Sequence, residues 1–331
     1  MILFGQEESP KKKESYKVRM DRFKLKKKDF KKHRYLAAGG SLSFLTYFGD
    51  LAPANNFIST DISQIKPGVS AFLQYRYAPR VSFKAELLYG RLTGDDFVSS
   101  DPTQPEDKSR YVRNLSFRND IVDFSLTSQV FIFKNYLDYE QRKYFDIYFS
   151  GGISVFYHNP KGKVPPYNVN DERFPNFGEW VALRPLGTEG QFSEHYSTEP
   201  YSNVQISIPV GGGFVFKLNE RLDFIFELNY RLLLTDYIDD VSTRYVDLGA
   251  LDSEMAKSMA DRSLEEYSIT TGEKRDISDL EVSYYTSPID GNRYKVANER
   301  GSVRGGSSND TFLSTSLKIS YVLNKNKSRE N

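Results

Sequence analysis

The sequence predicts an all-β fold, an eight-stranded antiparallel up-and-down transmembrane β-barrel with four long extracellular loops and short periplasmic turns. Three observations favour it. Residues 221–236 alternate between apolar and polar positions with a period of two, seven other segments carry the same period, and long and short connections alternate strictly between them. In a strand, successive side chains point to opposite faces, so each segment would present one apolar and one polar stripe.

Residues 221–236 (RLDFIFELNYRLLLTD) show the alternation most clearly. Their apolar stripe consists of Leu222, Phe224, Phe226, Leu228, Tyr230, Leu232 and Leu234. At about 3.3 Å per residue this stripe spans roughly 40 Å, whereas a strand tilted by about 45° crosses a bilayer in about 9–11 residues. The segment is therefore long enough to cross a membrane as a single strand.

The eight predicted strands occupy residues 36–48, 66–78, 80–93, 115–133, 144–158, 201–218, 221–236 and 310–323. Long polar segments (49–65, 94–114, 159–200 and 236–309) alternate with short links (78–79, 134–143 and 219–220). Alternate connections of an up-and-down barrel lie at opposite rims, so all four long loops fall at one rim, as in outer-membrane barrels. Near-helical spacing of apolar residues predicts one short helix within 251–266.

The polar stripe is expected to face the barrel interior. It carries a structural charge network of both signs, made of Arg76, Lys84, Glu86, Asp123, Glu227, Arg231 and Lys318. Tyrosines gather near strand ends, where an interfacial aromatic girdle would lie. The alternative is a soluble lipocalin-like barrel with an apolar cavity. Balanced interior charges and the rim asymmetry favour the membrane, and eight strands enclose a filled lumen rather than a diffusion pore.

Outside the barrel, 36–323, the chain divides into three segments. Residues 1–6 (MILFGQ) are interpreted as the remnant of a signal peptide. Residues 7–35 form a basic periplasmic arm, with 13 Lys and Arg against three acids between positions 11 and 34, and 324–331 form a periplasmic tail. The arm is predicted to dock an acidic partner, or else to be a solvated tail. Its docking residues would be Lys11, Lys12, Lys13, Lys26, Lys27, Lys28, Lys31, Lys32 and Arg34.

Candidate chemistry is sparse, and we predict no catalytic residue, no cofactor, no metal and no nucleic-acid partner. The chain has no Cys and three His, of which His195 follows Ser193 and Glu194 directly. A hydrolytic relay needs its groups brought together in space, which adjacency in sequence does not provide. Acids begin three of the long loops and could bind a divalent cation, although carboxylates that cap turns are far commoner. These acids are Asp50, Asp95, Asp96, Asp239 and Asp240.

Five short motifs resemble those of PorG-like proteins, outer-membrane barrels of the type IX secretion system of Bacteroidota. They are Gly49 to Leu51 (GDL), Gly90 to Asp95 (GRLTGD), Arg113 to Arg118 (RNLSFR), Leu183 to Gln191 (LRPLGTEGQ) and Asp236 to Thr243 (DYIDDVST, preceded by Thr235). The resemblance covers roughly residues 36–323 and implies a non-enzymatic barrel. It further implies association with the periplasmic ring of the secretion machine, which consists of a lipoprotein and its partner, in a Gram-negative outer membrane.

Three functional hypotheses follow. The first is a structural anchor that ties the periplasmic ring to the outer membrane. The ring belongs to machinery for protein transport and gliding motility. The second is an adhesin-like or envelope-stabilising barrel, whose working surface would be the long loops, in contact with outer-membrane lipid or lipopolysaccharide. The third is a lipid-modifying enzyme at the outer rim, which requires His195 or His158 to meet a partner group in the folded chain.

Overall fold

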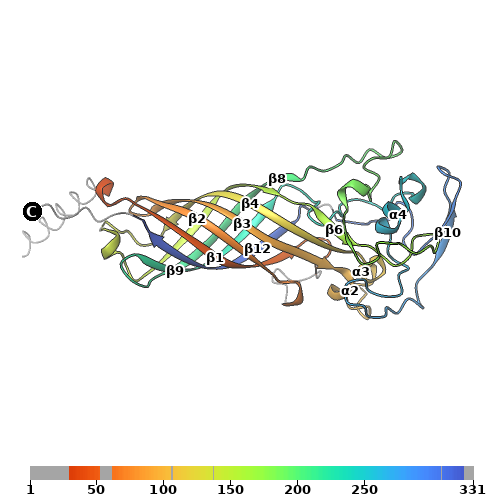
Figure 1. Ribbon diagram of the computed structural model, residues 1–331, viewed down its shortest axis with the longest axis horizontal. Helices are drawn as coiled ribbons and strands as arrows, with labels where there is room; N and C mark the ends of the chain where they lie inside the picture. The colour runs from red at the N-terminus through yellow and green to blue at the C-terminus, as the bar shows by residue number, and fades with distance from the viewer. Residues whose placement is uncertain (1–29, 53–61, 106, 137, 307, 324–331) are drawn as a thin grey trace, which may run out of the picture.

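The computed structural model describes residues 30–52, 62–105, 107–136, 138–306 and 308–323. Eight long strands form an elongated barrel wall (Figure 1). They are β1 (Tyr35–Phe48), β2 (Lys66–Ala78), β3 (Val81–Asp95), β4 (Ser116–Phe131), β5 (Phe145–Tyr157), β8 (Val204–Lys217), β9 (Leu222–Leu233) and β12 (Thr311–Val322).

The wall closes on itself through antiparallel pairs only. Each of the eight strands pairs with the next one along the chain, from β1 with β2 to β9 with β12. The first and last strands complete the ring, with Ala37 opposite Val322 and Phe48 opposite Thr311. The predicted fold class, an eight-stranded antiparallel up-and-down barrel, is confirmed.

The apolar stripes face outward. On β9, the outward-facing Leu228 is 42% exposed and Leu232 is 40% exposed, whereas the inward-facing Glu227 and Arg231 are each 2% exposed. The other wall strands repeat this alternation. A belt of exposed apolar side chains around a closed barrel suits a lipid environment and not water. The lipocalin-like alternative, with its apolar face inside, is wrong.

Strand ends differ from the prediction by up to three residues. β8 begins at Val204 and not at residue 201, since the Tyr201 hydroxyl donates to Asp240 in the loop layer. β9 ends at Leu233, because Asp236 turns away from the wall and accepts a hydrogen bond from Ser242 Oγ. At both places the side chain has a polar partner in the loops, which an alternation pattern does not reveal.

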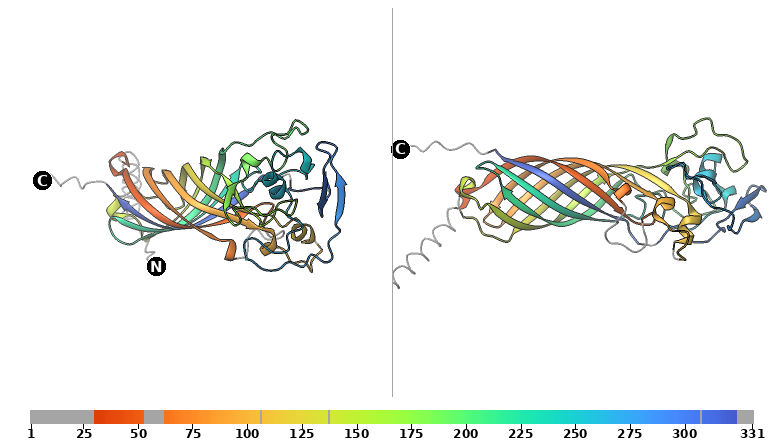
Figure 2. Two further views of the ribbon diagram at one scale, coloured as in Figure 1. Left: turned by 45° about the vertical axis from the view of Figure 1, so that its right-hand side comes forward. Right: turned by 90° about the horizontal axis from the view of Figure 1, so that it is seen from below.

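The two rims are unequal. At the short-turn rim, the connections are 79–80, 132–144 and 218–221, and both β1 and β12 have an end there. At the opposite rim the long loops build a folded cap (Figures 1 and 2). We call this layer the outer cap.

The outer cap contains short elements, of which the sequence pattern predicted only the helix within 251–266. They are α2 (Asp96–Ser99), α3 (Lys108–Arg113), α4 (Glu254–Ala260), β6 (Pro160–Lys163), β7 (Trp180–Ala182), β10 (Ser283–Thr286) and β11 (Arg293–Val296). β6 pairs with β4 and carries β7, so the wall continues into the cap. Single-turn 3-10 helices lie at η1 (Phe30–His33), η2 (Ile62–Gln64), η3 (Tyr139–Gln141), η4 (Arg184–Leu186) and η5 (Leu248–Ala250).

The short helix predicted within 251–266 is present as α4 (Glu254–Ala260). α4 starts after Ser253, whose hydroxyl accepts the N–H of Ala256, and stops before Asp261, which has an extended backbone. Its inner face buries Ala256, Met259 and Ala260 within the cap. Within the described ranges, every helix falls short of the length and apolar character that a membrane span requires.

Candidate functional site

Two basic and two acidic side chains meet in the middle of the barrel lumen. Lys84 Nζ lies 2.7 Å from Glu227 Oε2 and 2.7 Å from Glu86 Oε2. Lys318 Nζ lies 2.9 Å from Glu227 Oε1 and forms an ion pair with Glu86 as well, while Tyr148 donates to Glu227. All are buried. Because each charge has two partners of opposite sign, this central cluster links β3 and β12 to β9, and β3 and β9 lie on opposite sides of the ring.

A second inward-facing ion pair lies nearer the outer cap. Arg231 Nη2 is 3.3 Å from Asp123 Oδ1, and the same guanidinium donates to Asn229 on its own strand. Both charges are buried. Six of the seven predicted interior charges therefore fall into two compact groups.

Arg76 does not join these groups, so the prediction of one network is wrong for this residue. Its Nη2 donates to the Pro79 carbonyl at 2.9 Å, and its guanidinium lies over the Phe131 ring at 3.8 Å from the centroid. Arg76 is buried but sits near the end of β2, where the carbonyl of the following turn is within reach of its side chain.

A further ion pair closes the short-turn rim and was missed by the sequence pattern. Arg142 Nη2 lies 2.8 Å from Asp223 Oδ1, and Arg142 also donates to the carbonyls of Tyr139, Asn219 and Glu220. Asp223 had the correct inward parity in the alternation of β9. Arg142 had no such signal, because it lies in a connection and not in a strand.

At the other end, apolar side chains close the barrel mouth. The inward-facing Leu45, Ile121 and Phe312 are fully buried together with the loop residues Leu51 and Ile238. This cluster contains residues from β1, β4 and β12 and from two long loops, so it fixes the outer cap to the wall. Together with the central cluster, it leaves the lumen closed at two levels.

Arg113 holds three separate segments together at the base of the outer cap. Its guanidinium makes a two-point contact with Asp96, at 2.8 and 2.7 Å, and donates to the carbonyls of Asp50 and Arg304 at 2.6 Å each. Such bidentate pairs fix orientation as well as charge. Burial lowers the pKa of Arg113, but Asp96, together with the charges of Tyr245 and Asp50, raises it above its ordinary value.

Glu189 is a second junction, in the third long loop. Its Oε1 accepts the N–H groups of Ser242 and Thr243, and its Oε2 accepts the Thr243 hydroxyl and the Tyr237 hydroxyl. Arg304 Nη1 lies 2.8 Å from Oε1. A fully buried carboxylate is stable when its lone pairs are occupied in this way. This junction joins the third long loop to both ends of the fourth.

Two buried aspartates face one tyrosine hydroxyl where the cap meets the wall. The Tyr47 hydroxyl lies 2.6 Å from Asp239 Oδ2 and 3.1 Å from Asp310 Oδ1. A phenol has one hydrogen to donate, so both contacts can be hydrogen bonds only when one carboxyl is itself protonated. Burial, and then the charge of neighbouring carboxyls, raises the pKa of both Asp239 and Asp310 well above the usual range. The geometry and the electrostatics therefore agree on a retained proton.

Two further cap acids are shifted toward neutral pH. Burial raises the pKa of Asp236 to about 7, and the charges of Asp50 and Glu189 act in the same direction. Burial raises the pKa of Asp240 to about 6, although Arg304 opposes the shift. The Asp236 carboxyl has one buried oxygen, Oδ1, without a hydrogen-bond partner among the described residues.

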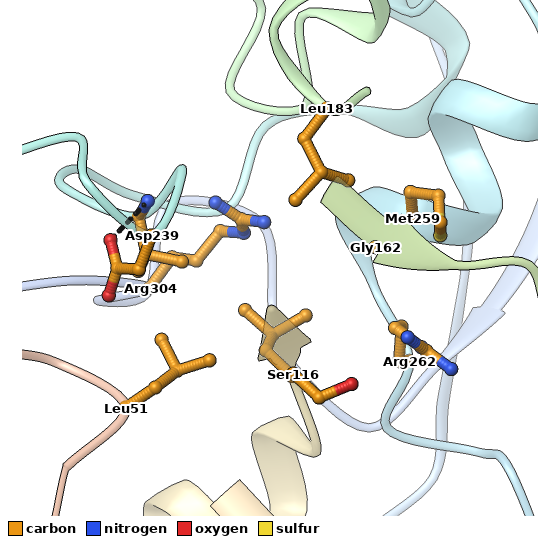
Figure 3. A pocket seen from close by; sticks show the side chains of 10 residues that line it. Leu51, Ser116, Gly162, Leu183, Asp239, Met259, Arg262 and Arg304 are labelled. Carbon is orange, nitrogen blue, oxygen red and sulfur yellow. Dashed lines mark hydrogen bonds between the residues drawn. The ribbon is translucent and has the colours of Figure 1, made fainter. Parts of the chain in front are cut away.

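A small cavity lies inside the cap, between residues of all four long loops (Figure 3). Its volume is about 10 Å³, which is close to the room that one water molecule needs. It is lined by Leu51, Leu115, Ser116, Gly162, Leu183, Asp239, Val241, Met259, Arg262 and Arg304. Two of these, Ser116 Oγ and Arg262 Nη1, are buried without a partner, so the cavity fits a structural water and is too small for an organic substrate.

The histidines do not form a catalytic relay in the described residues. His158 is buried between the rings of Phe156 and Tyr201, its Nε2 is 3.0 Å from the Ser202 carbonyl oxygen, and burial lowers its pKa to about 4. His195 is exposed, and its backbone N–H, not its ring, contacts Ser193 Oγ. The third histidine, His33, bonds to Asp138 at the short-turn rim, 2.6 Å away.

The five acids that begin the long loops are occupied by the protein itself. Asp95 caps α2 through the N–H groups of Phe97 and Val98, Asp96 pairs with Arg113, and Asp50 accepts the Gly306 N–H. Asp239 and Asp240 accept hydroxyl groups, as described above for Asp239 and from Thr188 for Asp240. In the part of the chain that the structure describes, no group of three or more potential ligands is arranged to hold a metal ion.

Most of the predicted docking arm lies outside the described residues, including Lys11, Lys12, Lys13, Lys26, Lys27 and Lys28. The backbone of Lys31 and Lys32 belongs to η1. Arg34 packs against the barrel: its Nε donates to the Tyr77 carbonyl at 2.9 Å and its guanidinium lies 4.1 Å from the centre of the Tyr77 ring. The proposed signal-peptide remnant, 1–6, and the tail, 324–331, also fall outside the description.

The motifs that carry the PorG-like resemblance converge in the outer cap. Asp50, Asp96 and Arg113 form one group of contacts, and Glu189 joins the loop segments 235–243 and 304. Segments more than a hundred residues apart in sequence thus share one buried layer. We interpret the motifs as residues that specify the packing of the loops over the barrel mouth.

Comparison with known proteins supplies no function. A family model described as a domain of unknown function (DUF6089) matches residues 31–172. No curated protein sequence matches this chain.

Solved barrel structures match over most of their length but at low similarity. OprG from Pseudomonas aeruginosa is 8% identical with a TM-score of 0.39, covering 88% of this chain and 96% of its own. Neisserial surface protein A is 7% identical with a TM-score of 0.33, and the match covers 87% of this chain and 96% of its own. Ail of Yersinia pestis, solved with a heparin analogue, is 8% identical with a TM-score of 0.31, and the match covers 88% of this chain and 97% of its own. At such scores none of these bears on function. The strand pairing and the outward apolar belt make this chain a barrel of the outer-membrane type.

Proposed function

We propose that this protein is a non-enzymatic outer-membrane component of a type IX secretion system that anchors the periplasmic lipoprotein ring to the outer membrane. The observation that carries the proposal is the closed lumen, with its central cluster of Lys84, Glu86, Glu227 and Lys318. A barrel filled by paired charges and an apolar plug does not conduct solutes, so its functional surfaces are its two rims.

In this proposal the short-turn rim faces the periplasm. Short turns and both chain ends lie on the periplasmic side of outer-membrane barrels, and both β1 and β12 have an end at the short-turn rim. The basic residues 11–34 directly precede β1 in the sequence. The link to type IX secretion itself rests on the resemblance of the cap motifs to those of PorG-like proteins.

Affinity purification from outer membranes, followed by mass spectrometry, tests the anchor. We expect the lipoprotein of the ring and its partner to be recovered with the full chain. A variant lacking residues 10–34 should recover less ring at low salt, where electrostatic docking is strongest. Recovery of the barrel alone, from membranes in which the ring is present, would overturn the anchoring role.

A second candidate function, adhesin-like binding, is favoured by one feature of the outer cap. A groove of about 790 Å³ is lined by Tyr196, Thr198, Ser242, Thr243, Arg244, Tyr245, Val246, Arg300, Gly301, Val303, Gly305 and Gly306. Its volume lies in the range of ligand sites, and it presents two arginines with several hydroxyls. Binding of whole cells to an acidic polysaccharide surface, lost in Arg244→Gln, would favour this function over the anchor.

A further inference from the structure

We propose that the short-turn rim is a binding surface for the phosphate groups of anionic phospholipids. The inference rests on the membrane-spanning barrel of the proposed function, but not on its secretion partner. At three places on this rim an exposed aromatic side chain has a basic side chain beside it: Tyr77 on β2, Phe133 just beyond β4, and Tyr321 on β12. In the order of the ring these three positions are well separated, so the basic groups surround the rim.

In two of the three pairs, the cation makes no ion pair with an acid among the described residues, although the charge of Lys143 acts on Asp146. Lys143 Nζ lies 4.3 Å from the centre of the Phe133 ring, and Arg221 Nη1 donates to the Tyr321 hydroxyl at 3.1 Å. Among the described residues, no carboxylate lies within ion-pair distance of either cation, as the salt bridges of this rim involve Arg142 and His33. A ring face attracts a cation without cancelling its charge. Both groups therefore keep a positive charge to offer to a ligand.

The third pair continues into the basic arm. The Arg34 guanidinium lies over the Tyr77 ring, with Cζ 4.1 Å from the centroid. Between positions 11 and 34, the chain leading to this contact carries 13 Lys and Arg against three acids. Arg34, the last basic residue of this segment of the sequence, thus occupies one of the three basic and aromatic positions.

The opposite rim treats its outward-facing cations differently. There, Arg91 Nε lies 2.5 Å from Asp120 Oδ1, and Arg118 lies 3.6 Å from the same carboxylate. Arg91, Arg118 and Asp120 all occupy outward-facing positions of β3 and β4. One carboxylate thus pairs with both arginines and offsets one of their two positive charges. At the short-turn rim, Lys143 and Arg221 have no such ion pair among the described residues.

Two acids of the short-turn rim are engaged by the protein itself. Asp138 bonds to His33 at 2.6 Å, and Asp146 Oδ1 accepts the backbone N–H groups of Phe133 and Ile147. Aromatic rings lie at the headgroup level of a bilayer, and Lys or Arg beside them extend toward the phosphates. Anionic lipids attract such groups more than zwitterionic ones, whose own amine offsets the phosphate.

The test uses the full chain in nanodiscs of phosphatidylethanolamine, with and without phosphatidylglycerol, and native mass spectrometry to count retained lipids. We expect wild type to retain phosphatidylglycerol selectively. Lys143→Gln and Arg221→Gln should each reduce this preference about fivefold, the effect of one cation near an anionic surface. Arg91→Gln is the matched control, since it removes an outward-facing cation from the opposite rim and should leave the preference unchanged.

Two results would overturn the proposal: equal retention of both lipids by wild type, or an equal loss of preference in Arg91→Gln. A normal strand signal in circular dichroism shows that each variant has folded. If the variants instead lose an acidic protein partner from outer membranes while retaining phosphatidylglycerol as wild type does, the rim binds protein and not lipid. Because the nanodiscs contain no ring protein, the lipid result is independent of the anchoring role.

Discussion

The lumen and the outer cap both bury many carboxylates, but they stabilise them by different means. In the central cluster, Glu86 and Glu227 each contact both Lys84 and Lys318, so opposite charges balance within the protein. In the cap, Asp239 and Asp310 face one tyrosine hydroxyl, and their pKa values are raised by burial. The lumen therefore depends on complete ion pairing. The cap combines the ion pairs of Asp96 and Glu189 with two carboxyls whose raised pKa favours the protonated form.

Breaking the central cluster should have the largest effect on the free energy of unfolding. Lys84→Met leaves Glu86 and Glu227 with one shared lysine in a buried site. Removing one partner of a buried ion pair typically costs about 3–5 kcal/mol. The free energy of unfolding, measured by urea titration in lipid vesicles, should fall by this amount.

The double variant Lys84→Met with Glu227→Gln is the control for charge balance. It keeps one acid and one base, Glu86 and Lys318, which remain in contact. We expect it to recover part of the loss, with a coupling energy that a double-mutant cycle measures. Additive losses would mean that packing, and not charge balance, holds the lumen together.

Gly49→Ala should disturb the cap by a smaller amount. A Cβ at this position would overlap Asp310 Oδ1 and the Tyr47 hydroxyl, the pair that holds the retained proton. Overpacking a buried site costs about 2–3 kcal/mol at the upper end of its usual range. Limited proteolysis of the long loops should show the loss. Gly151→Ala, which places a Cβ no closer than 3.9 Å to a neighbour, should be neutral.

The cap should lose stability as the pH rises, while the lumen does not. A carboxyl whose folded-state pKa is raised stabilises the fold below its unfolded pKa of about 4, and that contribution disappears as the pH rises through the folded value. With pKa values of about 7 for Asp236 and about 6 for Asp240, the loss falls between about pH 4 and pH 7. Hydrogen exchange of residues 235–243 at pH 5 and pH 8 measures it.

Asp236→Asn is the matched variant for the pH experiment. It cannot titrate, so hydrogen exchange in the cap should depend less on pH than in wild type. Exchange in the wall strands, where the acids of the central cluster already have basic partners, should change little. An equal pH response in cap and wall would contradict the distinction between the two regions.

Removing an outward-facing ion pair should have the smallest effect. Arg91 and Asp120 are partly exposed at the edge of the wall, and pairs of this kind contribute less than about 1 kcal/mol. The urea midpoint of Arg91→Gln should therefore stay close to that of wild type. A loss as large as that of Lys84→Met would mean that burial does not separate the strong pairs from the weak ones.

Strand periodicity predicted the wall because one physical rule, the alternation of side chains across a strand, acts on every residue of it. It placed Glu227 and Arg231 inside and Leu228 outside, as the structure has them. It could not place Arg142, which reaches the lumen from a connection. Nor could it show that the Arg76 guanidinium donates to the Pro79 carbonyl and does not join the carboxylates of the central cluster.

No such rule predicts the contacts within the cap. Its contacts join residues far apart in sequence, such as Glu189 with Arg304 and Tyr47 with Asp239, and loops have no repeating pattern that specifies partners. The motif resemblance did mark these segments, although it did not say what they touch. The retained proton could not be predicted from the sequence, because it follows from the distances of two carboxyl groups to one tyrosine hydroxyl.

The pairing of the first strand with the last sets a constraint on how the chain folds. Ala37 and Val322 are direct neighbours across the seam between β1 and β12, so the ring cannot close before the final strand has been synthesised and inserted. Until then β1 presents an open edge whose N–H and C=O groups lack partners, and such edges invite pairing with other chains. Bringing the two ends together also carries the largest loop-closure entropy in the molecule, which makes the seam the expected slow step of assembly.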